Sequence, residues 1–160
     1  MPKKATPEEN PNIVRRSLQE VIGKGYATFW NFKGLDVYLM GGKGSKKSKT
    51  CALRWIYLLT KYPQACLLVC RKVADTLRDS AFADLKWAIE VFGLQQEWRC
   101  KLSPLSIVNQ RTGQKIYFRG LDDFQKIASI TTDRPELKLC WCWFEEAFEV
   151  DDKDTFNRVN

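Results

Sequence analysis

The 160-residue sequence contains no histidine. This absence excludes a Ser-His-Asp triad, a Cys-His catalytic pair and an HExxH zinc site. An enzyme of this composition must therefore use carboxylates, Lys, Ser or Thr, Cys, or a bound metal. Such groups suit phosphoryl transfer, in which positioning and charge stabilisation supply most of the catalysis.

The sequence also lacks a CxxC pair, a signal peptide and any apolar run that approaches 18 residues. The missing CxxC spacing argues against a cysteine metal framework, and the missing apolar run argues against a membrane span. Four of the six cysteines lie in strongly apolar segments, where Cys behaves as a small hydrophobic residue. We therefore expect a protein with reduced thiols that resides in a cytosol.

The residues that are present favour a folded, basic domain. Hydrophobic residues make up 44% of the chain and six are Trp, which is enough to build a sizeable core. The net charge is +7, and the first 50 residues hold 10 Lys or Arg against 4 Asp or Glu. This excess is consistent with an anionic partner, either a nucleotide or a nucleic acid, and equally with a solvated basic face.

The order of apolar patterns predicts an α/β layered fold with a mainly parallel sheet flanked by helices. Residues 1–25 are expected to form a flexible arm and a short helix over 13–22, and residues 26–160 the main domain. Continuous apolar runs predict buried strands, and four-residue periodicity predicts helices. The expected elements are strands 35–40, 65–70 and 137–144, helices 47–61 and 75–93, and a hairpin of 105–109 with 114–119.

A glycine- and lysine-rich segment stands between the first expected strand and the helix that follows it. It nearly matches the phosphate-loop pattern GxxxxGK[ST], in which backbone N–H groups and a helix N-terminus surround phosphates. Lys47 would reach the β- and γ-phosphates, and Ser48 would bind Mg²⁺. The candidate nucleotide-binding residues are Gly41, Gly42, Lys43, Gly44, Ser45, Lys46, Lys47, Ser48 and Lys49.

Two features of this segment bear on its function. Lys46 stands where the pattern has its last Gly, the residue that tolerates a positive φ. The alternative to a phosphate loop is a surface turn. Against that alternative, Lys46, Lys47 and Lys49 crowd a helix start, where cations oppose the helix dipole and repel one another. A bound polyanion would relieve both penalties.

The strand expected at 137–144 ends in two carboxylates, Glu145 and Glu146. In phosphate-loop ATPases, a parallel strand carries one carboxylate for Mg²⁺, and a second acidic residue polarises the attacking water. We therefore interpret Glu145 as a metal-binding residue and Glu146 as the catalytic carboxylate. The alternative is a strand that simply ends in solvent. Ligands of parallel sheets lie beyond the carboxyl ends of the strands, which favours a site here.

Other candidates are less specific. Arg71 and Lys72 end the second strand and could contact DNA or phosphate, or merely solvent. The basic residues Arg78, Arg119 and Lys126 allow the same interpretations. Trp30, with Tyr26 and Phe29, could flank an adenine, whereas the other tryptophans are expected in the core.

Several segments, taken together and in this order, resemble the large subunit of tailed-phage terminases, in the PBSX-like branch. The matching segments are YLMGGKGSKKSKTCAL (38–53), LLVCRKVADTLRDSAFADLKWAI (67–89), SPLSIVNQRTGQKIYFRGLDD (103–123) and LCWCWFEEAFEV (139–150). The resemblance implies an ATPase that uses ATP and Mg²⁺ to translocate double-stranded DNA into a procapsid, in the cytoplasm of a bacterial host. It also implies a terminase small subunit, a portal protein and a homo-oligomeric ring of full-length chains as partners, with no membrane.

By the matched motifs, the resemblance assigns phosphate and Mg²⁺ to Lys47 and Ser48, the metal to Glu145 and catalysis to Glu146. Lys43 occupies the place where many terminases have an Arg that contacts the γ-phosphate. The family continues into a coupling motif and a nuclease domain. The resemblance therefore implies a truncated phosphate-loop ATPase domain with weak ATPase activity and no nuclease activity. A non-catalytic remnant that binds DNA or a partner, and another phosphate-loop enzyme such as a helicase-like ATPase or a small-molecule kinase, are the alternatives.

Overall fold

The computed structural model describes residues 17–22, 25–122 and 124–149. The chain divides into two compact units, Met1–Val37 and Tyr38–Asn160. In the first unit, the described helices are α1 (Leu18–Ile22) and α2 (Ala27–Trp30). Phe29 of α2 is buried.

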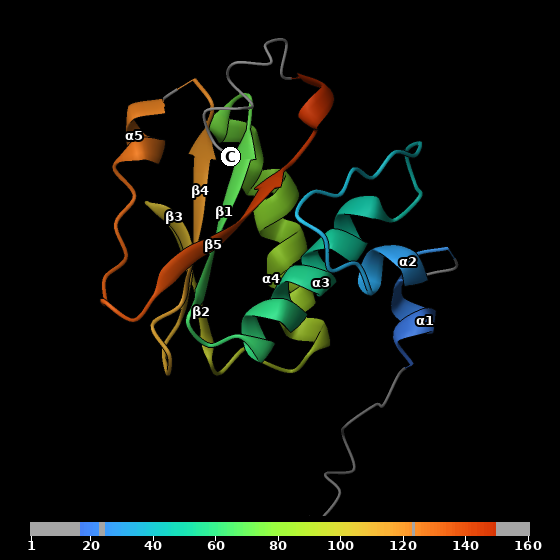
Figure 1. Ribbon diagram of the computed structural model, residues 1–160, viewed down its shortest axis with the longest axis horizontal. Coiled ribbons are helices and arrows are strands. Elements are labelled where there is room, and N and C mark those ends of the chain that lie inside the picture. The colour runs from blue at the N-terminus through green and yellow to red at the C-terminus, as the bar shows by residue number, and fades with distance from the viewer. Residues whose placement is uncertain (1–16, 23–24, 123, 150–160) are drawn as a thin grey trace, which may run out of the picture. The chain divides into compact units, whose positions relative to one another are not determined.

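The second unit contains the sheet and the helices that cover it (Figure 1). Its helices are α3 (Lys47–Lys61), α4 (Ala83–Val91) and α5 (Phe124–Ala128), with short helical turns η1 (Ala74–Leu77), η2 (Arg78–Phe82) and η3 (Ala147–Glu149). Its strands are β1 (Ala65–Arg71), β2 (Trp98–Leu102), β3 (Leu105–Asn109), β4 (Lys115–Gly120) and β5 (Lys138–Phe144).

The five strands form one sheet in the order β2-β3-β4-β1-β5. β1 pairs in parallel with both β4 and β5, whereas β3 pairs antiparallel with β2 and with β4. The expected α/β fold with flanking helices is confirmed, but the sheet is mixed rather than mainly parallel. The physical reason is the β3–β4 hairpin, whose short turn at residues 110–114 permits only antiparallel pairing.

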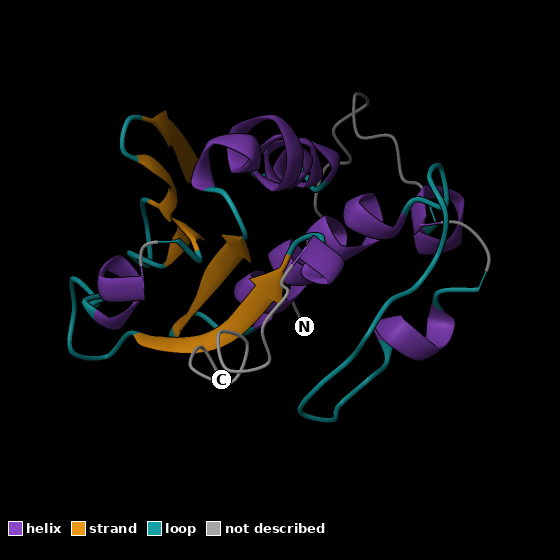
Figure 2. Cartoon of the chain, turned by 90° about the horizontal axis from the view of Figure 1, so that it is seen from above, coloured by secondary structure: helices purple, strands orange, loops and turns teal. Residues whose placement is uncertain are grey.

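β1 is buried on both faces of the sheet, which explains its uninterrupted apolar sequence. Cys66, Leu68 and Cys70 belong to a core cluster that includes Ile127 of α5. Because side chains alternate along a strand, Leu67 and Val69 face the opposite layer. That layer holds α3 and α4, which pack against each other beside the sheet (Figures 1 and 2).

Most sequence-predicted elements are confirmed, with nearly unchanged bounds. The strand over 65–70, the helix over 47–61, the hairpin and the strand over 137–144 are all present. The predicted helix over 75–93 is present as three consecutive helical segments of different type. The 3₁₀ turn η1 and the π-helical turn η2 precede the α-helix α4. Of the helix predicted over 13–22, the part before residue 17 lies outside the described residues. β2 was not predicted.

The strand predicted over 35–40 is wrong. The structure has no strand in this segment, and its apolar side chains other than Leu39 are exposed, with Leu35 fully exposed and Met40 95% exposed. A strand is stable only when a neighbouring strand satisfies its backbone hydrogen bonds. Among the described residues, no strand pairs with this segment, and the apolar pattern alone does not hold it in a ladder.

Gln114 joins α3, β1 and the hairpin through its buried amide. Its Nε2 donates to the carbonyl oxygens of Leu59, Tyr62 and Ala65, each at 2.9 Å. Its Oε1 accepts a hydrogen bond from the Thr112 hydroxyl at 2.9 Å. The side chain is 1% exposed, so water cannot replace these partners.

We expect Gln114→Leu to lower the free energy of unfolding by about 3 kcal/mol, because it leaves buried carbonyl groups without their donor. Chemical denaturation would measure the loss. The control is Gln95→Leu at an exposed turn position, which should change stability by less than about 0.5 kcal/mol. Equal stability of the two variants would contradict this role of Gln114.

Candidate active site

The glycine- and lysine-rich segment forms a turn that leads directly into α3. Gly44 has φ +85°, and Lys46, the N-cap residue of α3, has φ 63° and ψ 18°. Lys46 therefore adopts the left-handed conformation that favours Gly. The backbone shape expected of the last Gly in a phosphate loop is present, although a lysine provides it at a conformational cost of roughly 1–2 kcal/mol.

The start of α3 is strongly cationic, because Lys47 and Lys49 lie in its first turn and no acidic residue does. The Lys47 ammonium reaches back across the turn and donates to the Gly41 carbonyl. A Cβ on Gly41 would lie 3.2 Å from the Ser45 Oγ, so this position also has little room for a side chain. The Lys47 amine thus lies within the loop, where it could exchange the carbonyl for a phosphate oxygen.

Lys49 differs from the other lysines of the segment because its side chain is engaged by α4. Its Nζ lies 2.9 Å from Asp84 Oδ1 and 4.3 Å from the centre of the Trp87 ring. These contacts direct the Lys49 ammonium toward α4, so only its backbone N–H remains for a ligand at the helix N-terminus.

The acidic strand end lies beside the start of α3. Glu145 follows β5, and its backbone N–H donates to the Cys70 carbonyl at 2.8 Å. The Ser48 hydroxyl lies 3.4 Å from Glu145 Oε1 and donates to it across 97 positions of sequence. Two segments that were interpreted separately from the sequence are thus in direct contact.

Glu145 is a buried carboxyl group, with only 6% of the residue exposed. Its pKa is raised from 4.5 to about 7, chiefly by burial and also by the negative charges of Glu146 and Asp84, against a lowering by Arg71 and Ser48. A buried acid that is costly to ionise has a strong preference for a nearby cation.

Glu146 is exposed and has φ 51°, a left-handed conformation that a non-glycine residue rarely adopts. The turn that follows is tied to β1, because Arg71 binds Glu149 through Nε–Oε2 at 3.0 Å and Nη2–Oε1 at 2.8 Å. This hydrogen bonding raises the pKa of Arg71 and lowers the pKa of Glu149. Arg71, which ends the second of the predicted strands, therefore lies at the same sheet edge as the acidic pair.

The residues at this edge suit Mg²⁺ as part of a shared site. The Ser48 hydroxyl and the Glu145 carboxylate supply hard oxygen atoms, which Mg²⁺ prefers, and the buried carboxylate gains from a cation. The described residues hold no cluster of three or more acidic or sulfur ligands that would form a protein-only metal site. Mg²⁺ commonly binds through one or two protein oxygens, with substrate phosphates and water completing its shell.

The remaining candidates are distributed over several elements of the structure. Lys43 lies exposed in the turn before Ser45, and Arg78 lies exposed in η2. Arg119 instead donates to the carbonyls of Phe118 and Lys126. Lys72 is exposed, next to Arg71. The interpretation of Tyr26, Phe29 and Trp30 as an adenine wall stays a prediction, because these residues belong to the other unit.

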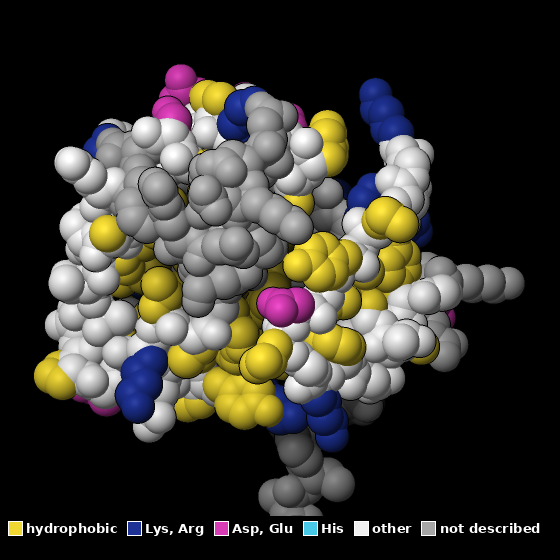
Figure 3. Space-filling model, turned by 45° about the horizontal axis from the view of Figure 1, so that its top comes forward, with side chains coloured by type: hydrophobic (Ala, Val, Ile, Leu, Met, Phe, Trp, Pro, Cys, Tyr) yellow, Lys and Arg dark blue, Asp and Glu magenta, His cyan; other side chains and the backbone are white. Residues whose placement is uncertain are grey.

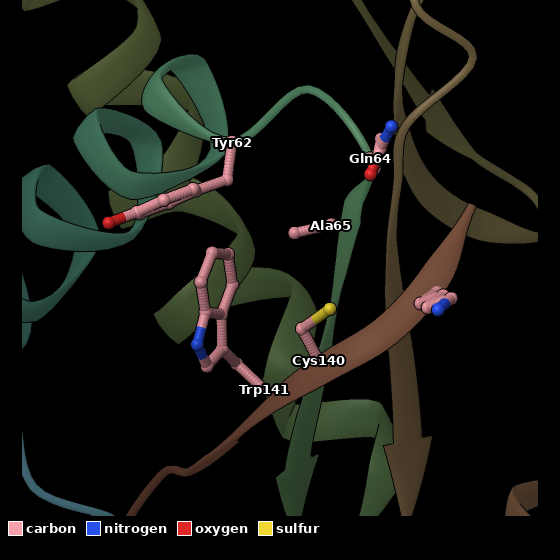
Figure 4. Close-up of a pocket in the computed structure, with 6 residues that line it drawn as sticks. Tyr62, Gln64, Ala65, Cys140 and Trp141 are labelled. Carbon is pink, nitrogen blue, oxygen red and sulfur yellow. The ribbon is translucent and has the colours of Figure 1, made fainter. Parts of the chain in front are cut away.

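The second unit has a shallow pocket of about 220 Å³ that is separate from the acidic strand end. It is lined by Tyr62, Gln64, Ala65, Lys138, Cys140 and Trp141 (Figure 4). Ala65 and Lys138 begin β1 and β5, whereas Glu145 follows the last residue of β5. Trp141, the lining residue nearest to Glu145 in the sequence, precedes it by four strand positions, or roughly 13 Å, so this pocket lies apart from the candidate site.

Sequence reasoning did not identify Asp84, Trp87 or Glu149 as neighbours of the site. Asp84 and Trp87 fall on one side of the predicted helix, but their contact with Lys49 depends on how that helix packs. Glu149 reaches Arg71 because the chain turns at Glu146. The only signal in the sequence was that charged residues follow the apolar strands directly, as Arg71 and Glu145 do.

Comparison with known proteins identifies the family of this site. The sequence model of the family described as phage terminase large subunit matches residues 35–160, which include the loop and both glutamates. The chain belongs to this family. The resemblance inferred from the sequence motifs is confirmed.

Two curated members of the terminase family illustrate the extent of similarity. The chain is 38% identical over 115 residues to the terminase large subunit of Bacillus phage SPP1, covering 72% of this chain. It is 34% identical over 121 residues to the PBSX phage terminase large subunit of Bacillus subtilis strain 168, covering 76% of this chain. Each alignment covers 26% of the relative, so the chain spans about a quarter of the length of these terminases.

Hydrophobic side chains also lie on the surface of the molecule, as Figure 3 shows in yellow. They include Tyr38, Met40 and Leu139. In the described part of the chain, no helix combines the length and apolarity that a bilayer crossing requires.

We expect Lys46→Gly to raise the free energy of unfolding by about 1 kcal/mol, because Gly relieves the left-handed strain. Thermal or chemical denaturation would measure the gain. Lys43→Gly removes the same charge at a position without a positive φ, and it should be neutral or destabilising. A gain of the same size in Lys46→Ala would instead attribute the effect to charge.

Glu145 also makes stability depend on pH. Its folded-state pKa of about 7 exceeds the ordinary value of 4.5, so the folded protein holds the proton more tightly than the unfolded chain. In metal-free buffer, the free energy of unfolding should fall on the order of 2 kcal/mol as pH rises from about 4.5 to 7. Denaturation across this range should show a smaller fall for Glu145→Gln. The exposed control Glu136→Gln should follow the wild type, and an unchanged slope in Glu145→Gln would contradict the assignment.

Proposed function

We propose that this chain is the nucleotide-binding part of a terminase motor, which binds and hydrolyses ATP with Mg²⁺ to drive double-stranded DNA into a procapsid. The observation that carries the proposal is the 3.4 Å contact between Ser48 and Glu145. It joins the loop at the start of α3 to the acidic end of a parallel strand, which is the arrangement that phosphate-loop ATPases require.

In this proposal, each residue of the site has a distinct task. The backbone N–H groups of residues 41–49 and the Lys47 ammonium hold the phosphates. Ser48 and Glu145 hold Mg²⁺, which when bound offsets the negative charge that develops on the phosphates. Glu146 orients the attacking water and accepts its proton. Lys43 lies at the turn and contacts the γ-phosphate as a point charge.

The proposed fold is the phosphate-loop ATPase fold, and the proposed partners follow from the family. They are double-stranded DNA, a terminase small subunit and a portal protein or procapsid, with assembly into a homo-oligomeric ring in the full-length protein. The names of both relatives, terminase large subunits of SPP1 and PBSX, support this assignment.

The test of the proposal uses two variants with different expected effects. Lys47→Ala should weaken binding of a fluorescent ATP analogue at least about tenfold, since it removes a charge-assisted contact to phosphate. Glu146→Gln should keep that affinity and lower DNA-stimulated phosphate release by about 100-fold. The control Lys86→Ala, an exposed lysine of α4, should match the wild type in both assays.

The alternatives give different results in the same assays. Lys47→Ala that binds the analogue as tightly as the wild type would overturn the nucleotide site. Binding of DNA without any ATP hydrolysis would favour a non-catalytic remnant. Phosphate transfer to a nucleoside, without any dependence on DNA, would favour a small-molecule kinase. Salt-sensitive DNA binding would instead favour the motor over the kinase.

A further inference from the structure

The five residues after β5 form a small loop with both ends attached to β1. At its start, the Glu145 N–H donates to the Cys70 carbonyl at 2.8 Å. At its end, the Glu149 carboxylate accepts two hydrogen bonds from Arg71. Cys70 and Arg71 are consecutive residues, so the loop is closed on adjacent positions of one strand.

Glu146 lies inside this closed loop, in a left-handed conformation with φ 51°. The Glu149 N–H donates to the Glu146 carbonyl at 2.9 Å, which completes the η3 turn. A strained residue keeps its conformation only when the surrounding structure determines it, and here that structure is the pair of attachments to β1.

Arg71 is itself well fixed, so it can hold the loop. Its backbone carbonyl accepts from the Leu121 N–H at 2.9 Å, and its residue pairs with Gly120 in the parallel β1–β4 ladder. The Arg71 and Glu149 side chains are 19% and 28% exposed, so their charges are partly shielded from water. A bidentate guanidinium–carboxylate pair fixes the orientation of the two groups as well as their distance, whereas a lysine ammonium would fix only the distance.

We propose that Arg71 and Glu149 are positioning residues that hold the Glu145–Glu146 turn in its working geometry at the start of α3. The proposal rests on the proposed function, because it takes Glu146 as the carboxylate that acts on water. It also gives Arg71 a role other than direct contact with DNA or phosphate. The Nε and Nη2 donors of Arg71 already bind the Glu149 carboxylate.

The experiment compares Arg71→Ala, Glu149→Ala, Arg71→Lys, the single reversals Arg71→Glu and Glu149→Arg, and the charge swap that combines the two reversals. The matched controls are Arg111→Ala and Glu97→Ala, which break an exposed ion pair with a 3.5 Å separation between two turns next to β2 and β3. Each variant is measured by thermal melting, by hydrogen exchange of the amides of residues 145–149, and by the kcat and KM of DNA-stimulated ATP hydrolysis.

Both alanine variants should exchange the Glu145 and Glu149 amides at least about tenfold faster than the wild type, while the amides of β3 stay protected. Their kcat should fall about tenfold or more with KM changed less than threefold, because a displaced catalytic group affects the reaction rather than binding. Arg71→Lys should recover only part of the loss, the swap should recover more than either reversal alone, and the controls should resemble the wild type.

Two results would overturn the proposal. One is wild-type exchange at residues 145–149 in both alanine variants. The other is a general loss of folding in every variant of the pair, the swap included, which would make the contact purely structural. If the wild type binds no nucleotide, the proposed function fails, and the exchange data still decide whether the pair holds the turn.

Discussion

The parallel pairing of β1 with β5 is the interaction on which the site depends. Parallel strands end at the same edge of a sheet, so Arg71 and Glu145 are brought together there by the register that pairs Cys70 with Phe144. β1 also pairs with β4 and is buried on both faces, which makes it the rigid centre of the sheet. α3 packs on one side of this centre, and its first turn therefore lies beside the acidic edge.

Long, uniform patterns in the sequence were sufficient to predict much of this architecture. The run ACLLVC is apolar at every position, and such a run is stable only when both faces are covered, as in β1. The turn Arg111-Thr112-Gly113 between two apolar segments predicted the hairpin, and Gly113 has φ +80° there. The loop and the Glu145–Glu146 pair were predicted to share one sheet edge, and Ser48 does contact Glu145.

The remaining features depend on partners that the sequence does not specify. Residues 35–40 have a strand pattern, but the described sheet offers them no ladder, whereas β2 has a weak pattern and is a strand because β3 pairs with it. The left-handed conformation at position 46 could not be predicted, because the residue there is Lys, and side chains other than Gly disfavour a positive φ. The contacts of Lys49 with Asp84 and of Arg71 with Glu149 join distant residues through tertiary packing.

The buried Glu145 carboxyl has a further consequence in a chain without histidine. With a pKa of about 7, it supplies the near-neutral titration that an imidazole supplies in many other sites. In the proposed site, a divalent cation that binds this carboxylate would displace its proton, so cation binding and proton release would form a single coupled equilibrium. The acidity of the medium would thereby set the apparent affinity of this sheet edge for a metal, and each binding event would release part of a proton to the buffer.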